Sequence, residues 1–217
     1  MTRSSFLGEL QRLQDAVLAM GDNVATNVVA AVTHLKRRDL DKAQALITAD
    51  RYINEQRIKL EMDCLTLLAT QQPMAGDLRT IASMFAIIGE LERINDYAKS
   101  IGKITLALGS DALIKPLIDI PIMAEKARSM LERSLTAFAT RDEQLARSIP
   151  ADDDEVDALY IAVYQELMAK VIDDKTAVDQ ANNLLWVAHN LERTADRVIN
   201  ICERVVYMVT GELTELG

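Results

Sequence analysis

The sequence predicts an all-α protein made of two tandem three-helix bundles that are related by an internal duplication. Its 217 residues include only 8 glycines, 4 prolines and 4 % aromatic residues, a balance that favours packed helices over sheets. Apolar residues recur at spacings of three and four over long stretches, as they do on one face of a helix. The segment Leu91-Glu-Arg-Ile-Asn-Asp96 also returns one hundred residues later as Leu191-Glu-Arg-Thr-Ala-Asp196, which indicates a duplicated unit.

The first repeat is assigned to residues 1–109, and its first helix is long. From Phe6 to Leu35 the apolar positions keep their helical spacing for about eight turns. Three cations at positions 36–38 then suit the negative end of the helix dipole. A short segment over residues 39–47 follows, and Asp39 is suited to cap it.

The second helix of this repeat is predicted to begin at Asp50 and to end before the segment 71–76, which contains Pro73. Its inward-facing residues are expected to be Ile53, Ile58, Leu65 and Leu68. The third helix is predicted over residues 77–108. Its packing face is expected to consist of Ile87, Leu91, Ile94, Ala98 and Ile101.

The second repeat is assigned to residues 110–217, after a boundary marked by Gly109, Pro116 and Pro121. A shift of 103 positions aligns its first two helices with those of the first repeat. The matched pairs are Met20 with Met123, Leu35 with Phe138, Arg38 with Arg141, Asp39 with Asp142, Asp50 with Asp153 and Asn54 with Asp157. In the third helix the shift falls to 100, because the connection before that helix is shorter.

Each repeat carries two pairs of acidic or amide side chains that are spaced four residues apart. In the third helices the two members of a pair lie about 40° apart on one face, away from the apolar side. If the second and third helices run antiparallel, a rise of about 1.5 Å per residue brings both pairs of a repeat to the same height. We therefore expect an acidic cluster on the surface of each repeat, across a helix–helix seam.

Gathered oxygen ligands suit hard or borderline cations, here iron, zinc, manganese or magnesium. The candidate metal ligands are Asp50, Asn54, Glu92, Asp96, Asp153, Asp157, Glu192 and Asp196. Because Asn54 stands where the second repeat has Asp157, the second-repeat site is predicted to be the stronger one. An ordinary solvated ion-pair face is the alternative, since arginines follow both glutamates.

Other residues receive simpler interpretations. His189 precedes Glu192 by one turn, and it is either a further ligand or a surface histidine. Trp186 is expected to be a packing residue. Cys64 and Cys202 lie within helical patterns far apart in the sequence, and both are expected to be buried, reduced thiols.

The net charge of −9 argues against a nucleic-acid-binding protein, which would need a basic surface. The N-terminus has no apolar run of signal-peptide length, and no stretch approaches the roughly 18 uninterrupted apolar residues of a membrane span. We therefore expect a cytoplasmic protein that meets a membrane only through partners.

The repeated Leu-Glu-Arg-x-x-Asp segment in two three-helix halves resembles the PhoU family of phosphate-signalling regulators. The segment Gln72-Pro-Met-Ala-Gly-Asp-Leu-Arg79 and the ending Val206-Tyr-Met-Val-Thr-Gly211 support this resemblance. It implies a homodimeric cytoplasmic negative regulator that couples the Pst phosphate transporter, through its ATPase subunit, to a PhoR-type sensor histidine kinase. It also implies metal at the eight residues named above. Asn95 and Ala195 depart from the glycine that the family favours in this motif, and Asn54 departs from an acidic residue.

The sequence does not predict an enzyme. A di-iron carboxylate site of the ferritin type needs Glu-x-x-His pairs, but Ala31 precedes His34 and Trp186 precedes His189 at that spacing. Phosphate-binding Gly-x-x-x-x-Gly-Lys and nucleophile Gly-x-Ser-x-Gly motifs are also missing from the sequence. The remaining alternative is a metal-free helical scaffold that serves another ion-transport or stress circuit.

Overall fold

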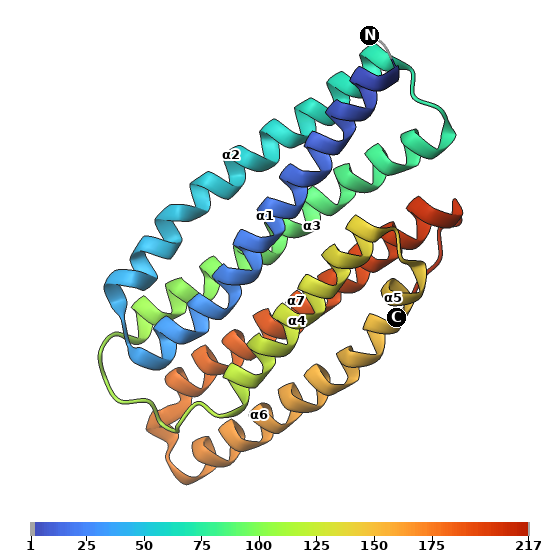
Figure 1. The fold of residues 1–217 in the computed structure, drawn as a ribbon. Coiled ribbons are helices and arrows are strands. Elements are labelled where there is room, and N and C mark those ends of the chain that lie inside the picture. The colour runs from blue at the N-terminus through green and yellow to red at the C-terminus, as the bar shows by residue number, and fades with distance from the viewer. Residues whose placement is uncertain (1–2, 217) are drawn as a thin grey trace.

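The computed structural model describes residues 3–216, and every regular element within this range is a helix (Figure 1). The first repeat contains α1 (Arg3–Arg37), α2 (Leu40–Gln71) and α3 (Ala75–Leu108). The second contains α4 (Asp119–Thr140), α5 (Glu143–Ser148), α6 (Asp153–Asp173) and α7 (Val178–Thr210), with short 3-10 turns at Ile149–Asp152 and Lys175–Ala177. The predicted all-α fold of two three-helix units is therefore confirmed.

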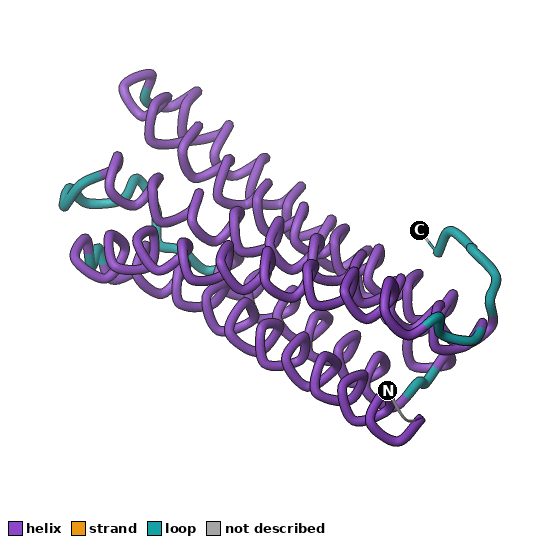
Figure 2. Tube along the Cα trace, turned by 90° about the horizontal axis from the view of Figure 1, so that it is seen from above, coloured by secondary structure: helices purple, strands orange, loops and turns teal. Residues whose placement is uncertain are grey.

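The two repeats lie side by side and share one interior. Four helices form the centre of the molecule: α3 packs along α7, α1 packs against α3 and α4, and α4 packs against α7. The outer helices are α2, which covers α1 and α3, and α6, which covers α4 and α7 (Figure 1). Seen from above, the long helices run lengthwise through the molecule (Figure 2). A single continuous cluster of buried apolar side chains runs through both repeats.

The apolar stripe of α1 is buried as predicted, from Phe6 to Leu35. By length and composition alone, α1 is also the one helix in residues 3–216 that could cross a membrane. Its position accounts for this apolarity, because α1 contacts α2, α3 and α4 and contributes a row of fully buried side chains to the core.

The duplication extends to backbone conformation. Arg38 and Arg141 end α1 and α4 with φ angles of 57° and 56°, in the left-handed region that non-glycine residues seldom adopt. In both repeats the next residue is an aspartate, Asp39 or Asp142, whose carboxylate accepts a hydrogen bond from a backbone N–H three residues later and so caps the following helix. The paired Leu35 and Phe138 are both fully buried.

Two details of the predicted second helix are wrong. The helix does not begin at Asp50, because α2 is continuous from Leu40. The second repeat does have an interruption there, with α5 and a 3-10 turn before α6, and Pro150 lies in that turn where the first repeat has Ile47. A proline removes a backbone donor and cannot continue a helix, so only the second repeat is interrupted.

The second error concerns the inward face of α2. Ile53 is buried as predicted, but Ile58 and Leu65 are about half exposed. The side chains that face the core after Ile53 are Leu60, Cys64 and Leu67. The error arose because α2 has apolar residues on more than one side. Its sequence is therefore compatible with two different inward faces. Both cysteines are buried free thiols, and burial raises the pKa of Cys64 to about 11 and of Cys202 to about 12.

Candidate metal centre

The eight predicted ligands lie on the two seams that were expected for them. The first-repeat residues lie on α2 and α3, and the second-repeat residues lie on α6 and α7. One feature differs from the prediction: Asp50 is not on the surface, because only 5 % of the residue is exposed. Its carboxylate therefore needs partners inside the protein.

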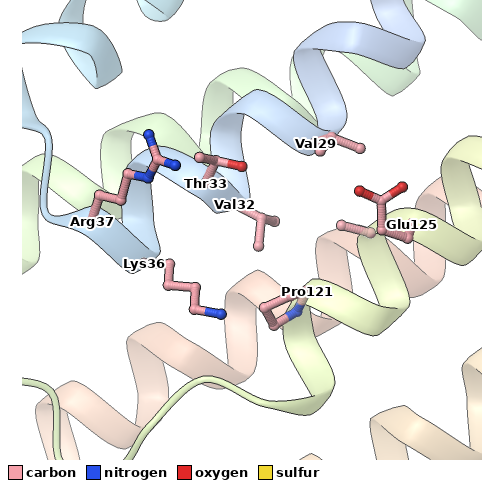
Figure 3. Close-up of a pocket in the computed structure, with 8 residues that line it drawn as sticks. Val29, Val32, Thr33, Lys36, Arg37, Pro121 and Glu125 are labelled. Atoms are coloured by element: carbon pink, nitrogen blue, oxygen red, sulfur yellow. The ribbon is translucent and has the colours of Figure 1, made fainter.

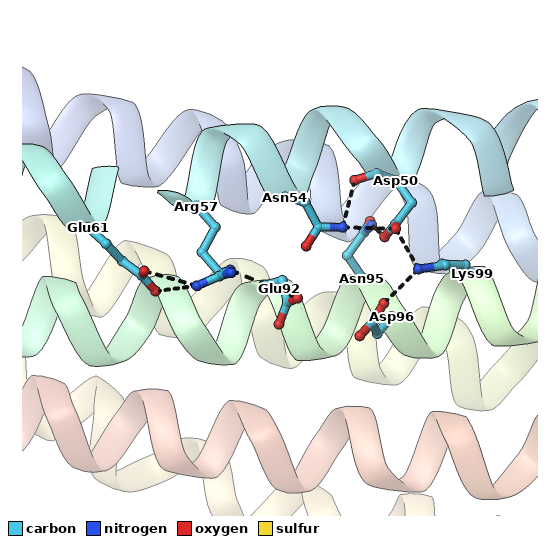
Figure 4. A network of polar contacts seen from close by, with 8 residues as sticks. All are labelled: Asp50, Asn54, Arg57, Glu61, Glu92, Asn95, Asp96 and Lys99. Atoms are coloured by element: carbon cyan, nitrogen blue, oxygen red, sulfur yellow. Dashed lines mark hydrogen bonds and ion pairs between the residues drawn. The ribbon is translucent and has the colours of Figure 1, made fainter. Parts of the chain in front are cut away.

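The partners of Asp50 are three protein donors (Figure 4). Asn95 Nδ2 donates to Oδ1 at 2.9 Å, and Asn54 Nδ2 donates to Oδ2 at 2.9 Å. Lys99 Nζ also donates to Oδ2, at 2.6 Å. Both carboxylate oxygens are thus hydrogen-bonded, and the negative charge is neutralised by a lysine from the neighbouring helix.

The same network reaches α1 and Asp96 of α3. Asn27 on α1 donates to Asn95 Oδ1 at 2.8 Å, so Asn95 links α1 to α2. Lys99 Nζ lies 3.2 Å from Asp96 Oδ1 and therefore bridges carboxylates of two helices. The network raises the pKa of Lys99, first through the hydrogen bond to Asp50.

Glu92, the fourth predicted ligand of this repeat, faces a second cation. Arg57 Nε lies 3.9 Å from Glu92 Oε1, at ion-pair distance, while Arg57 Nη1 is 2.9 Å from Glu61 Oε2. Burial, and then the nearby Asp96, raise the pKa of Glu92. Arg57, Asn95 and Lys99 were not predicted as site residues, since no local spacing marks them and only their approach across the seam reveals their role.

The second repeat has the matching carboxylates, with Asp157 in place of Asn54, and it lacks those cations. By the duplication, Arg57 corresponds to Tyr160, Asn95 to Ala195 and Lys99 to Ile199. Burial raises the pKa of Asp153 to about 6, and the charges of Asp157, Asp196 and Glu192 add to the effect. The pKa values of Asp157 and Glu192 are raised as well, first by burial and next by Asp196.

Two oxygens of this second cluster are buried without a hydrogen bond. Asp153 Oδ1 and Glu192 Oε2 are buried atoms that accept no hydrogen bond from any described residue. His189 Nδ1 lies 3.3 Å from Glu192 Oε2, and Arg193 Nη1 lies 2.6 Å from Asp196 Oδ2. Unpaired buried oxygens and raised carboxyl pKa values both indicate a site that lacks positive charge.

The two repeats therefore differ in which side-chain oxygens are available to coordinate a cation. In the first repeat both oxygens of Asp50 already accept hydrogen bonds, from amide and ammonium donors that a metal would have to displace or share. In the second, four carboxylates are available, and two of them carry a buried oxygen that accepts no hydrogen bond. Such oxygens are ligands that Mg²⁺, Mn²⁺, iron or Zn²⁺ take. Across residues 3–216, no three His, Cys, Asp or Glu side chains already converge as a metal would require, so binding would need side-chain rotations. Metal ligation by the eight residues stays a prediction.

A hydrophobic surface borders this second cluster, and its tryptophan was predicted incorrectly. Trp186 is 53 % exposed instead of packed in the core. Its ring lies edge-on to His189, with centroids 5.4 Å apart. Together with Tyr160, Asn182 and Leu185 they line a shallow cavity of about 260 Å³.

A larger cavity lies elsewhere, between α1 and α4 (Figure 3). Its volume is about 470 Å³, and its walls combine Val29, Val32 and Pro121 with the cations Lys36 and Arg37. None of the eight predicted ligands lines it. The cavity is therefore separate in composition from the acidic clusters.

Comparison with known proteins assigns the family. The PhoU domain matches twice, at residues 17–105 and 120–205, one match in each repeat. Two curated relatives are called "Phosphate-specific transport system accessory protein PhoU homolog". The one from Streptococcus pneumoniae is 34 % identical over 99 % of this chain and 100 % of its own, and the one from Clostridium acetobutylicum is 33 % identical over the whole of both chains.

Solved structures agree with this assignment. The crystal structure of the phosphate transport system regulatory protein PhoU from Streptococcus pneumoniae matches with a TM-score of 0.90 at 32 % identity, over 97 % of this chain and 100 % of that one. The crystal structure of PhoU from Pseudomonas aeruginosa matches with the same TM-score and identity, over 95 % of this chain and 100 % of that one. Sequence, repeat structure and fold thus agree over nearly the full length, and the chain belongs to the PhoU family.

Proposed function

We propose that this protein is an accessory regulator of phosphate transport that keeps the phosphate-starvation response switched off while phosphate is plentiful. The observation that supports this proposal is full-length similarity to relatives named as accessory proteins of the phosphate-specific transport system. Its helical surfaces suit a role in contacting partners, and no catalytic motif is needed for such a role. We propose that it is not an enzyme.

The proposal includes a location and partners. The protein acts in the cytoplasm as a homodimer, between the ATPase subunit of the Pst transporter and a PhoR-type sensor histidine kinase. It reaches the membrane only through these partners and does not bind nucleic acid, in keeping with its net charge of −9.

A deletion strain tests the regulatory role. In high-phosphate medium, deletion is expected to switch on a reporter driven by a phosphate-starvation promoter, and the wild-type gene supplied in trans is expected to switch it off again. A reporter that stays silent in the deletion strain at high phosphate would refute the regulatory role.

We also propose that the second repeat binds a divalent or transition metal ion through Asp153, Asp157, Glu192 and Asp196. The support is chemical: a cation would bring positive charge to carboxylates whose pKa values are raised, and it would be coordinated by two oxygens that accept no hydrogen bond. Elemental analysis of protein purified without chelator is expected to find iron, zinc, manganese or magnesium. The double substitution Glu192→Ala and Asp196→Ala is expected to remove both the metal and the rise in melting temperature that the metal produces.

The alternative is a metal-free scaffold, and the exposed aromatic surface around Trp186 favours it. A protein that only docks partners would use this apolar patch and would not need a cation. The deletion strain complemented by the Glu192→Ala and Asp196→Ala variant separates the two: full repression by a metal-free variant supports the scaffold, and lost repression by a folded variant supports metal-dependent regulation.

A further inference from the structure

The two acidic clusters differ in where their positive charge comes from. We infer that in the first repeat Lys99, assisted by Arg57, takes the place of a metal ion, so that each chain has one metal site and that site lies in the second repeat. This inference rests on the metal binding proposed above and specifies its stoichiometry and its location.

The geometry of Lys99 is that of a bridging cation. Its Nζ lies 2.6 Å from Asp50 Oδ2 on α2 and 3.2 Å from Asp96 Oδ1 on α3. A metal that joined these helices would contact the same two carboxylates. The lysine side chain is one-quarter exposed and the Asp50 side chain 7 % exposed, so solvent does little to screen the pair.

The other carboxylate of the cluster is also matched by a protein cation. Arg57 Nε is 3.9 Å from Glu92, and its Nη1 holds Glu61 at 2.9 Å (Figure 4). Asn54 and Asn95 point their amide nitrogens, and not their oxygens, at Asp50. These amides are oriented to serve a carboxylate that is already neutralised, since a metal would face their oxygens instead.

The duplicated positions in the second repeat lack both cations. Ile199 occupies the position of Lys99, and Tyr160 that of Arg57. There the buried oxygens Asp153 Oδ1 and Glu192 Oε2 accept no hydrogen bond from a described residue, although His189 Nδ1 lies 3.3 Å from Glu192 Oε2. In the first repeat, both oxygens of Asp50 accept hydrogen bonds. The α2–α3 seam is therefore held together whatever the metal supply, and only the α6–α7 seam responds to a metal ion.

Exchanging residues between the repeats tests the inference. The variants are Lys99→Ile, which copies Ile199, and Ile199→Lys, which copies Lys99. Lys103→Ile is the control, because Lys103 is exposed one turn further along α3 and has no charged partner among the described residues. Each protein is stripped with EDTA, and Mn²⁺ binding per chain is measured by calorimetry alongside melting temperature with and without Mn²⁺.

Wild type and Lys103→Ile are expected to bind one Mn²⁺ per chain. Ile199→Lys is expected to bind none and to melt higher than wild type in EDTA, because the new ammonium replaces the missing cation. Lys99→Ile is expected to melt lower in EDTA and to recover in part with Mn²⁺, while binding approaches two ions per chain. If Lys99→Ile does not fold, the Ile199→Lys result decides the question.

Three results would overturn the inference, and each has a different meaning. If wild type binds two Mn²⁺ per chain, the metal part of the proposed function stands but Lys99 does not replace a metal. If wild type binds none, the proposed metal binding itself fails. A Lys99→Ile protein that melts lower but ignores Mn²⁺ would also count against the inference, because the ammonium would then not occupy a cation site.

Discussion

Asp50 illustrates how much a single buried carboxylate demands of its surroundings. Its two oxygens take hydrogen bonds from three side chains that belong to two helices. One of these, Asn95, is itself held by Asn27 of α1. Three helices of the first repeat therefore meet at one polar network inside an otherwise apolar interior.

Removing Asn95 is expected to destabilise the protein. Asn95→Ala leaves Asp50 Oδ1 and Asn27 Nδ2 without their partners, and an unpaired buried polar group costs about 1–3 kcal/mol. Urea unfolding should show a loss of that size. The exposed Asn23→Ala on α1 is the control and is expected to change stability by less than about 0.5 kcal/mol. Equal losses in the two variants would argue against a structural role for the network.

Asp153 predicts a dependence of stability on pH in the metal-free protein. Its pKa in the folded state, about 6, is above the ordinary value of 3.8, so the folded protein binds this proton more tightly than the unfolded chain does. The stabilisation that comes from this tighter proton binding is fully present below pH 3.8, the ordinary pKa of the group. It is lost as the pH rises through about 6. In EDTA, Asp153→Asn is therefore expected to stabilise the protein at pH 8.

At pH 8 the free energy of unfolding of Asp153→Asn is expected to exceed that of wild type by about 1 kcal/mol, once the partial exposure of the carboxyl group is allowed for. At pH 4 the gain should be much smaller, because the wild-type carboxyl group is then largely protonated in the folded state. Urea unfolding at the two pH values measures the difference. A gain of the same size at both pH values would show that charge repulsion is not its cause.

At the scale of elements, one proline separates the otherwise matched repeats. Pro150 interrupts the helical path before α6, whereas Ile47 lets α2 continue from Leu40 through Asp50. Asp153 therefore lies in the first turn of α6, and Asp50 lies in the third turn of α2. Asp50 is buried where α2 meets Asn95 and Lys99 of α3, while its counterpart is half-buried at a helix start.

The continuous helix can be interrupted by design. Ile47→Pro removes a backbone hydrogen bond inside α2 and crowds the preceding turn, which costs about 3 kcal/mol or more. Ile47→Ala is the control, because it removes the side-chain atoms that lie near Gly102, where an added Cβ would stand 3.2 Å from Ile47 Cγ1, but keeps the helix. Urea unfolding should show a clearly larger loss for the proline variant. Similar losses would mean that α2 tolerates a break at this position, as the second repeat does.

At the scale of the whole molecule, the two repeats are halves of one core. The pairs α3 with α7 and α1 with α4 join them, and the buried apolar cluster is continuous across the join. Close approach matters there: a Cβ atom at Gly21 of α1 would stand 2.4 Å from Leu135 Cδ1 of α4. Leu135 is itself buried, so its side chain has little space to move.

Gly21→Ala is expected to weaken the contact between the repeats. Overpacking of a filled core typically costs about 1–3 kcal/mol, which exceeds the gain of about 0.5–1 kcal/mol that alanine brings to a helix. The matched control is Gly89→Ala in α3, where an added Cβ meets no atom within 4 Å, and this variant is expected to be stabilised. Thermal unfolding should move the two variants in opposite directions. A stabilised Gly21→Ala would show that the repeats have room to separate.

The sequence alone determined the helices, the duplication and the seams that hold the acidic pairs. These features depend on local rules: apolar spacing, the cap at Asp39, and the rise of a helix along its axis. Apolar spacing gave the wrong inward face for α2, because the apolar residues of this helix lie on two of its faces.

Only the tertiary structure decided how the acidic pairs are neutralised. Lys99, Arg57 and Asn95 act on Asp50 and Glu92 across a helix seam, and no spacing along one helix marks such a contact. The sequence placed two similar clusters, and it attributed their difference to Asn54. The structure assigns the larger difference to a lysine in one repeat and an isoleucine in the other, because electrostatic neutralisation depends on distance in space and on burial, which local sequence patterns do not encode.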